Sequence, residues 1–347
     1  MTDTMVAAVL KGPCNLVVEK VKRPIVSSGQ VVIDVSACSI SNNDLKFWIS
    51  GRGKIDSSLN PFIMGHDFCG VVSDPGESDL KIGERVVFWP KQCCGACHYC
   101  RKEKELFSDD IRNLNNIDYL CNGAFAQSFV GSIRHAFRIP HNISDLTASL
   151  LDPVILAYNA ISRGKISRGQ KVLIVGNDFI SALAAELAKI SGAECVAMVY
   201  ENESKIELIR SMGFVDIFIQ YERIVQQRAD IIENKFDAVF DLEGHRGNLE
   251  SCITACRPGG SIVFISNNCT HVLNIDLFRA SAKNITFIGG PVCTYLDLHE
   301  ALSLLEKGII NPEKYINLII NLNQLQQTME RLNEPNNPFL KVVVLPN

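Results

Sequence analysis

The stretch from residue 169 to residue 201 constrains the fold of this chain more than any other. An apolar run rich in β-branched residues, 171–175, ends at Gly176, a segment with helical periodicity follows, and 195–200 is a second apolar run. This pattern predicts a strand, a turn, a helix and a second, parallel strand. Such a βαβ unit is typical of a doubly wound parallel α/β sheet of the Rossmann type, which binds dinucleotides at the turn.

The turn departs from the glycine fingerprint of such units. The pattern G-x-G-x-x-G predicts glycines at 176, 178 and 181, but Asp178 and Ser181 stand at the second and third places, with Phe179 and Ile180 between them. The second glycine normally lets the backbone approach the pyrophosphate. A carboxylate ~5 Å from a phosphate charge, at an effective dielectric of ~20, repels it by roughly 3 kcal/mol, on the order of a hundredfold in affinity. Asp178 therefore argues against tight dinucleotide binding, whereas the small Ser181 still permits helix–strand packing.

The residues after the second strand bear on the choice of cofactor. An acidic residue usually holds the adenosine ribose here, and the chain has Tyr200 at that place with Glu201 after it. Glu201 near the ribose hydroxyls favours NAD. Lys205 near a 2′-phosphate favours NADP, although a lysine at a helix start is also consistent with a solvated side chain. The sequence predicts NAD or NADP, with NAD favoured, and leaves a chain without nucleotide as an open alternative.

Length and composition set the broad class. The chain has 347 residues, a net charge of −4, 47% hydrophobic and 21% charged residues, values that are ordinary for a globular protein of about two domains. There is no basic footprint for nucleic acid, no apolar run of the ~18 residues that a membrane span needs, and no visible signal peptide. The 13 cysteines suit a reducing compartment with free thiols. We expect a cytoplasmic protein with neither nucleic acid nor membrane as a partner.

The type of secondary structure changes near residue 150. Short strands with glycine corners, as in β-barrels, precede this point, and alternating strands and helices follow it. The last predicted strand, 341–345, again has barrel character. We therefore predict one domain formed by residues 1–153 together with 294–347, and a second, nucleotide-binding domain formed by 154–293.

Two local predictions concern the C-terminal half. Residues 298–306 have helical periodicity, with Asp297 as the candidate N-cap and Gly308 as the stop. Residues 257–260, Arg-Pro-Gly-Gly, predict a turn that follows a helix and precedes a strand at 260–265.

Several motifs occur in a distinctive order along essentially the whole chain. They are Asp44-Leu-Lys-Phe-Trp48 with Gly51-Arg52, Gly65-His66-Asp67, the cysteines at 94, 97 and 100, Leu151-Asp152-Pro153, the βαβ unit and Arg257-Pro-Gly-Gly260. In this order the chain resembles the medium-chain zinc-containing alcohol and polyol dehydrogenases, and within them the sorbitol dehydrogenases. The resemblance implies a GroES-like β-barrel catalytic domain wrapped by both termini, an inserted Rossmann domain and an active site in the cleft between them. It also implies hydride transfer between NAD(P) and an alcohol or polyol, or its ketone.

The resemblance carries the family's catalytic zinc ligands onto four positions. The cysteine position is Ser41, the histidine is His66, its acidic neighbour is Asp67, and the carboxylate of the Glu-Pro motif is Asp152. Zinc in such a site keeps an open position for the substrate oxygen and stabilises its alkoxide. A serine hydroxyl is a poor replacement for a thiolate, so His66, Asp67 and Asp152 are the candidate ligands, for zinc or a harder divalent ion. The alternative is that His66 is a hydrogen-bonded cleft histidine without a metal.

The family's proton relay falls on Asn43 and Lys46 in this chain. Asn43 can orient a water or hydroxyl but cannot transfer a proton. Lys46 is a candidate acid or ligand of a substrate phosphate, with a solvated surface lysine as an equal alternative. Cys38 and Cys69 lie on predicted strands, and we expect both to be core thiols.

A second metal site is predicted on a loop. Cys94, Cys97 and Cys100 have the spacing of zinc ligands. In the family a fourth cysteine follows the third by eight residues, and Ser108 stands at that position. We predict a structural zinc on the three thiolates and a fourth ligand, with a loop of reduced cysteines as the alternative. Zinc at His66 and Asp152 is less favoured than zinc on this loop.

Three functions stay open. The first is the NAD(P)-dependent dehydrogenase or ketone reductase, and the second is a metal-free reductase in which Lys46 or Tyr158 polarises the carbonyl. The third is a non-catalytic descendant that acts as a binding or regulatory subunit. This third hypothesis is motivated by the accumulated departures from the family, which are Ser41, Asn43, Ser108, Asp178, Ser181 and Tyr200. The enzyme hypotheses require a small alcohol or ketone substrate, and the resemblance implies a homodimer or homotetramer paired through an edge strand such as 284–289.

Overall fold

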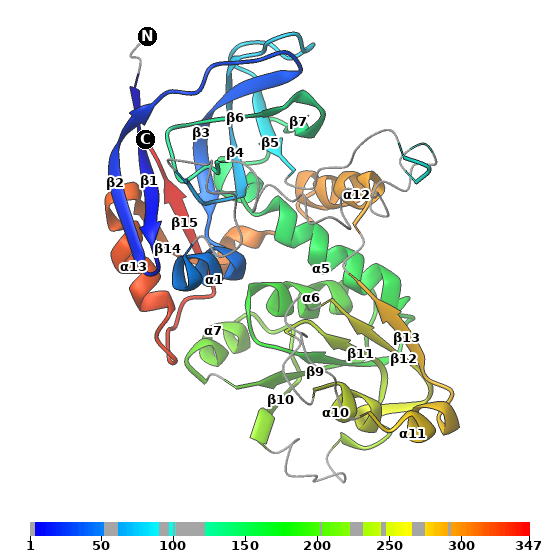
Figure 1. Cartoon of the computed structure of the whole chain (residues 1–347). Helices are drawn as coiled ribbons and strands as arrows, with labels where there is room; N and C mark the ends of the chain where they lie inside the picture. The colour runs from blue at the N-terminus through cyan, green and yellow to red at the C-terminus, as the bar shows by residue number, and fades with distance from the viewer. Residues whose placement is uncertain are drawn as a thin grey trace. The chain divides into compact units, whose positions relative to one another are not determined.

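The computed structural model describes residues 4–51, 62–89, 97–99, 101, 122–201, 203–222, 232–243, 248–265, 275–290 and 293–347 (Figure 1). The chain divides into two compact units, Met1–Asp152 with Leu298–Asn347 and Pro153–Asp297.

The first unit is mainly β structure. Its described strands are β1 (Thr4–Gly12), β2 (Asn15–Lys22), β3 (Gln30–Ser39), β4 (Asp67–Asp74), β5 (Arg85–Phe88), β6 (Ser128–Ser132), β7 (Ala136–Arg138), β14 (Ile316–Asn321) and β15 (Lys341–Leu345). Its described helices include α1 (Asn42–Ser50), α4 (Asp145–Ala148) and α13 (Leu325–Leu332). Two further helices, α5 (Leu151–Gly164) and α12 (Tyr295–Glu306), run across the boundary between the units.

The sheets of this unit join the two ends of the chain. β1 and β2 form an antiparallel pair, and a seven-stranded sheet has the order β14-β15-β3-β4-β5-β7 with β6 beside β3. β15 runs antiparallel to β3 and pairs Val343 with Ser39, and β3 in turn pairs Ser39 with Asp67 of β4. The C-terminal strand β15 therefore lies in the same sheet as β3 and β4.

An aromatic cluster anchors the strand that carries the histidine motif. Phe68 of β4 stacks on Phe88 of β5 with ring centroids 5.6 Å apart, and Phe129 of β6 lies 4.7 Å from each. All three side chains are almost fully buried. Offset and tilted aromatic pairs of this kind add about 1 kcal/mol each beyond the burial of apolar area, so the start of β4 is held rigidly.

The second unit is a parallel sheet with helices. Its strands are β8 (Lys171–Val175), β9 (Cys195–Tyr200), β10 (Ile217–Gln220), β11 (Phe236–Asp241), β12 (Cys256–Phe264) and β13 (Thr286–Gly289), in the order β10-β9-β8-β11-β12-β13. The described helices include α6 (Phe179–Ile190), α7 (Ile206–Ser211), α10 (Asn248–Ala255) and α11 (Leu277–Ala282). Numbered by sequence, the strand order is 3-2-1-4-5-6, that of a Rossmann fold. This confirms the predicted doubly wound sheet, and it makes β8 and β11 neighbours whose carboxyl ends meet at one edge.

Two local predictions were wrong in detail. α12 begins at Tyr295 rather than at residue 298. Thr294 Oγ1 accepts from the amide of Asp297, and the Asp297 carboxylate accepts from the amide of Thr294. Thr294 is therefore at the cap position, and Asp297 closes a capping box one turn later.

The predicted turn at 257–260 belongs to β12, because β12 pairs with β11 from Cys256 onward through a register irregularity.

Candidate functional site

His66 lies just before β4, and its position depends on Gly65. Gly65 has a φ of +93°, and a Cβ there would lie 2.8 Å from Cδ1 of Phe125 and 3.0 Å from Sγ of Cys38. A side chain at this position would be strained and would clash. The Gly65 amide donates to Oδ1 of Asp44 at 3.2 Å. The glycine of the Gly-His-Asp motif therefore lets the loop sit close to Asp44, with His66 buried beside it.

Asp44 holds one side of the imidazole. Its Oδ1 lies 3.6 Å from Nδ1 of His66. Its Oδ2 accepts hydrogen bonds from the amide and the hydroxyl of Ser41, at 2.8 and 2.7 Å. Burial opposes ionisation of Asp44, but His66 and the Ser41 hydrogen bonds outweigh it and lower the pKa of this carboxyl. Asp44 is therefore a fixed negative charge beside His66.

Ser41, at the family's cysteine position, caps helix α1. Its hydroxyl accepts from the amide of Asp44 at 3.1 Å, and the Asp44 carboxylate reaches back to the amide of Ser41, which completes a capping box. The spacing Ser-x-x-Asp predicts such a cap from sequence, and this signal was missed.

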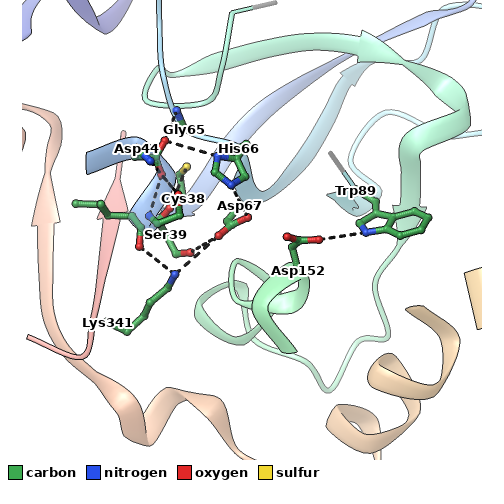
Figure 2. Close-up of polar contacts among 11 residues, drawn as sticks. Cys38, Ser39, Asp44, Gly65, His66, Asp67, Trp89, Asp152 and Lys341 are labelled. Carbon is green, nitrogen blue, oxygen red and sulfur yellow. Dashed lines mark hydrogen bonds and ion pairs between the residues drawn. The ribbon is translucent and has the colours of Figure 1, made fainter. Parts of the chain in front are cut away.

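Asp67 lies on the other side of the imidazole. Its Oδ1 is 3.3 Å from Nε2 of His66, and its Oδ2 is 3.8 Å from Nζ of Lys341 and 3.5 Å from the hydroxyl of Ser39. Figure 2 shows His66 between Asp44 and Asp67, with Lys341 on the far side of Asp67. Burial raises the pKa of Asp67 to about 6, against the opposing effects of His66 and Lys341.

Lys341 is a buried cation that the sequence did not single out. It is 5% exposed, and its ammonium group donates to the carbonyl of Ile40 at 3.0 Å. It opens an apolar strand, a place where a lysine usually reaches solvent. Its approach to Asp67 depends on the register of β15 on β3 and of β3 on β4, which no local pattern encodes.

Asp152 contacts a different partner. The indole Nε1 of Trp89 donates to Oδ1 of Asp152 at 3.2 Å, and the Asp152 side chain points to Trp89 in Figure 2. The negative charge of Asp152 also raises the pKa of Asp67, so Asp152 lies close enough to repel the Asp67 carboxylate.

These residues do not form a zinc ligand set in this structure. A catalytic zinc ion takes three protein ligands. Ser41 is engaged as a helix cap and Asp152 accepts from Trp89, so Nε2 of His66 and Oδ1 of Asp67 are the two donors that face each other. Among the described residues no group of three or more His, Cys, Asp or Glu is arranged to hold a metal ion. We therefore derive no catalytic step through a metal, and zinc at His66, Asp67 and Asp152 stays a prediction.

The cysteines singled out from the sequence fall into two groups. Cys38 and Cys69 are fully buried, and burial raises the pKa of both thiols, which confirms them as core thiols. Cys97 is partly exposed. Cys94 and Cys100 lie outside the described residues, so the predicted zinc loop stays a prediction.

The two relay candidates lie on α1. Asn43 is partly buried, and the side chain of Lys46 is exposed to solvent. The neighbouring protein still lowers the pKa of Lys46 through desolvation. Neither observation assigns these side chains a role, and the relay stays a prediction.

The fingerprint turn follows β8 in the second unit. Asp178 is the N-cap of α6, and its Oδ1 accepts from the amide and the hydroxyl of Ser181, at 2.9 and 2.8 Å. Phe179 and Ile180 are the first residues of the helix, and Gly176 precedes it with a φ of +131°. The second fingerprint position thus carries a helix cap in place of a glycine.

Two further residues border this turn. Glu243 follows β11, and its Oε1 accepts from the amide of Asn177 at 2.9 Å. Burial and the charge of Glu243 raise the pKa of Asp178, and the hydrogen bonds from Ser181 and the charge of Lys205, at the start of α7, offset this only in part. Glu243 was not recognised from sequence, because its place at the turn requires β11 to lie beside β8.

The ribose candidates lie at the end of β9. Tyr200 is its last residue, with its ring 6.5 Å from that of Phe218 on β10. Glu201 comes next and is exposed.

Comparison with known families decides the classification. The alcohol dehydrogenase GroES-like domain matches residues 27–141, and the zinc-binding dehydrogenase domain matches residues 180–307. The chain belongs to the medium-chain, zinc-type alcohol and polyol dehydrogenase family. NAD(P) and zinc are the cofactors of this family.

Relatives match this family member over its whole length. Sorbitol dehydrogenase of Bacillus subtilis (strain 168) is 26% identical over 350 residues, which cover 99% of this chain and 98% of the relative. An alcohol dehydrogenase from E. coli CFT073, solved with NADH, has a TM-score of 0.86 at 20% identity, and a zinc-binding dehydrogenase from Sinorhizobium meliloti 1021, bound to NADP, has 0.86 at 21%. Each structural match covers 99% of this chain and 100% of the other. At these identities the structural likeness shows the fold.

Proposed function

We propose that this chain is an NAD(P)-dependent oxidoreductase that interconverts an alcohol or polyol and the corresponding ketone. In the oxidising direction a hydride passes from the carbinol carbon to C4 of the nicotinamide, and the hydroxyl proton passes to a protein base or to water. The observation that carries the proposal is the buried His66 between Asp44 and Asp67, in the part of the chain that matches the alcohol dehydrogenase domain.

In this proposal His66 is the group that binds the substrate oxygen and exchanges its proton, with Asp67 and Asp152 nearby. Asp44 orients the imidazole, since its carboxylate is itself fixed by three donors, the amide and hydroxyl of Ser41 and the amide of Gly65. The ammonium group of Lys341 offsets the negative charge of Asp67. Positioned general acid–base groups of this kind contribute about 10²–10⁴ in rate.

The similarity to a sorbitol dehydrogenase supports polyols as the substrate class. NAD is favoured as the cofactor, because Glu201 directly follows the strand at which a ribose diol is usually held by a carboxylate. Parallel titrations with NADH and NADPH test this choice. Glu201→Ala is expected to weaken the affinity for NADH more than the affinity for NADPH. An equal loss of affinity for both nucleotides would contradict the assignment.

A second candidate is the same hydride transfer without a catalytic metal. It is favoured by the donor set at His66, where Ser41 replaces a thiolate and is engaged as a helix cap. A structural zinc on Cys94, Cys97 and Cys100 is compatible with either candidate. Metal analysis before and after chelation, alongside activity, separates them, because only the metal-dependent enzyme loses turnover when catalytic zinc is removed.

We also propose a cytoplasmic homo-oligomer. β13 is an edge strand of the parallel sheet, and Phe287 on it is 40% exposed. Pairing of this edge with that of a second copy would extend the sheet. None of the helices in the described residues has the length and apolar character to cross a membrane. Light scattering at several protein concentrations tests for a dimer or tetramer, and a monomer at all of them would contradict it.

The experiment for the main proposal is turnover with NAD and NADP against polyols and secondary alcohols, and with NADH and NADPH against ketones. His66→Ala is expected to lower kcat/KM by about 10²–10⁴. The matched control is His141→Ala, since His141 is an exposed histidine of the same unit. Absence of turnover by the folded wild-type chain with every pair would contradict the proposal and favour a binding subunit.

A further inference from the structure

Two carboxylates of this chain, those of Asp178 and Glu243, lie at the turn between β8 and α6. Asp178 Oδ1 accepts from the amide and hydroxyl of Ser181, and Glu243 Oε1 accepts from the amide of Asn177 at 2.9 Å. In a Rossmann unit, the backbone amides of this turn and of the helix start face the cofactor's pyrophosphate. Two amides of the region therefore have carboxylates of this chain as acceptors.

Glu243 is brought to the turn by the sheet. β8 and β11 pair in parallel with Val175 opposite Asp241, so the residues after both strands emerge at the same edge. Glu243 packs closely on the turn, since a Cβ at Gly176 would lie 2.8 Å from its Cγ. This side chain therefore lies directly against the backbone that a pyrophosphate has to approach.

The two carboxylates also repel each other. Burial and then the charge of Glu243 raise the pKa of Asp178, and the Ser181 hydrogen bonds and the Lys205 ammonium offset this only in part. A pyrophosphate would add further negative charge to this place. The charge of the two carboxylates and the occupancy of the Asn177 amide by Glu243 therefore both oppose binding of the dinucleotide.

We propose that Glu243 is a built-in competitor of the cofactor's pyrophosphate and has to leave the Asn177 amide before a dinucleotide binds. The inference rests on the proposed function, since it concerns the affinity of the same cofactor. It makes Glu243 an affinity-determining residue, supplied by the loop after β11, with Asp178 as a second, fixed source of repulsion.

Two variants separate the charge of Glu243 from its occupancy of the turn. Glu243→Gln removes the charge but keeps an oxygen that can accept from Asn177, whereas Glu243→Ala removes both. Asp178→Ser removes the other charge and keeps a side chain that caps α6. Glu207→Gln is the matched control, because Glu207 is an exposed glutamate on α7 of the same unit.

The measurement is the Kd of NADH and of ADP-ribose for each folded variant, with adenosine as a ligand that lacks the pyrophosphate. Glu243→Gln is expected to bind NADH and ADP-ribose about tenfold more tightly than the wild type, and Glu243→Ala at least as tightly as Glu243→Gln. Asp178→Ser is expected to tighten binding as well. Adenosine affinity, and all affinities of Glu207→Gln, are expected to stay within about twofold of the wild type.

Three results would overturn the inference, and one of them would also remove the proposed function. If the wild type binds NADH and both Glu243 variants bind it equally or more weakly, Glu243 is not a competitor, and the proposed function stands. If neither the wild type nor any variant binds NADH, NADPH or ADP-ribose, the inference and the proposed function both fall. Equal tightening for adenosine would also overturn it, because adenosine has no pyrophosphate to repel.

Discussion

Nζ of Lys341 lies 3.8 Å from Oδ2 of Asp67, and both side chains are buried. The two residues belong to β15 and β4, the strands on either side of β3. A buried carboxylate beside His66 thus has a buried cation from the other end of the chain as its partner. This pairing brings the C-terminal strand into the buried polar cluster around His66.

Lys341→Met is expected to lower the free energy of unfolding by about 3 kcal/mol, because removal of one partner leaves a buried charge uncompensated. Chemical denaturation measures this loss. The control is Lys341→Met combined with Asp67→Asn, which removes both charges and is expected to recover at least about 1 kcal/mol of it. Strict additivity of the two single substitutions would contradict the pairing.

Ser41→Ala is expected to lower the free energy of unfolding by about 1 kcal/mol through loss of the N-cap of α1. Ser41→Thr keeps a capping hydroxyl and is expected to stay within about 0.5 kcal/mol of the wild type. Urea denaturation of the three proteins tests the role. If both substitutions are neutral, the hydroxyl does not stabilise the helix.

Gly65→Ala is expected to cost about 3 kcal/mol, since it combines an unfavourable positive φ with close contacts to Phe125 and Cys38. Gly83 provides the control, because its φ is +88° but a Cβ there meets nothing within 4 Å. Gly83→Ala is expected to cost about 1 kcal/mol, from the backbone alone. Equal thermal destabilisation of the two variants would show that packing at Gly65 contributes nothing.

His135 is expected to make stability depend on pH. It is 3% exposed, and burial, with a smaller effect of Arg134, lowers its pKa to about 4. The unfolded chain has a histidine pKa of about 6.5 and binds the proton first. This contribution is therefore complete above pH ~6.5 and is lost as the pH falls toward ~4, by up to about 3 kcal/mol.

The measurement for His135 is the free energy of unfolding of the wild type and of His135→Phe between these two pH values. The difference between the two proteins isolates this histidine from other titrating groups. It is expected to shift in favour of His135→Phe as the pH falls. A difference that does not change with pH would contradict the burial of a neutral imidazole.

Local patterns were sufficient for the fold class and for most of its elements. The apolar runs and the turn glycine predicted β8, α6 and β9, because their formation depends on the period of the sequence. The cap of α12 was placed one turn late, since Asp297 and Thr294 both suit a helix start and the hydrogen bonds decide between them.

Relations between distant strands were not predictable in this way. Lys341 and Glu243 reach their partners only through strand register and strand order. Ser41 stands at the position of a zinc-ligating cysteine and lacks the thiolate, whereas its spacing to Asp44 indicates a helix cap.

The most direct test of the central claim follows the hydride itself. Wild-type protein is incubated with NAD or NADP and with sorbitol or a secondary alcohol deuterated at the carbinol carbon, and the nucleotide is analysed by NMR and mass spectrometry. We predict deuterium at C4 of the reduced nicotinamide with the wild type and with His141→Ala, and little or none with His66→Ala. Folded wild-type protein that transfers no deuterium from any of these alcohols to either nucleotide would contradict the assignment as an alcohol or polyol dehydrogenase.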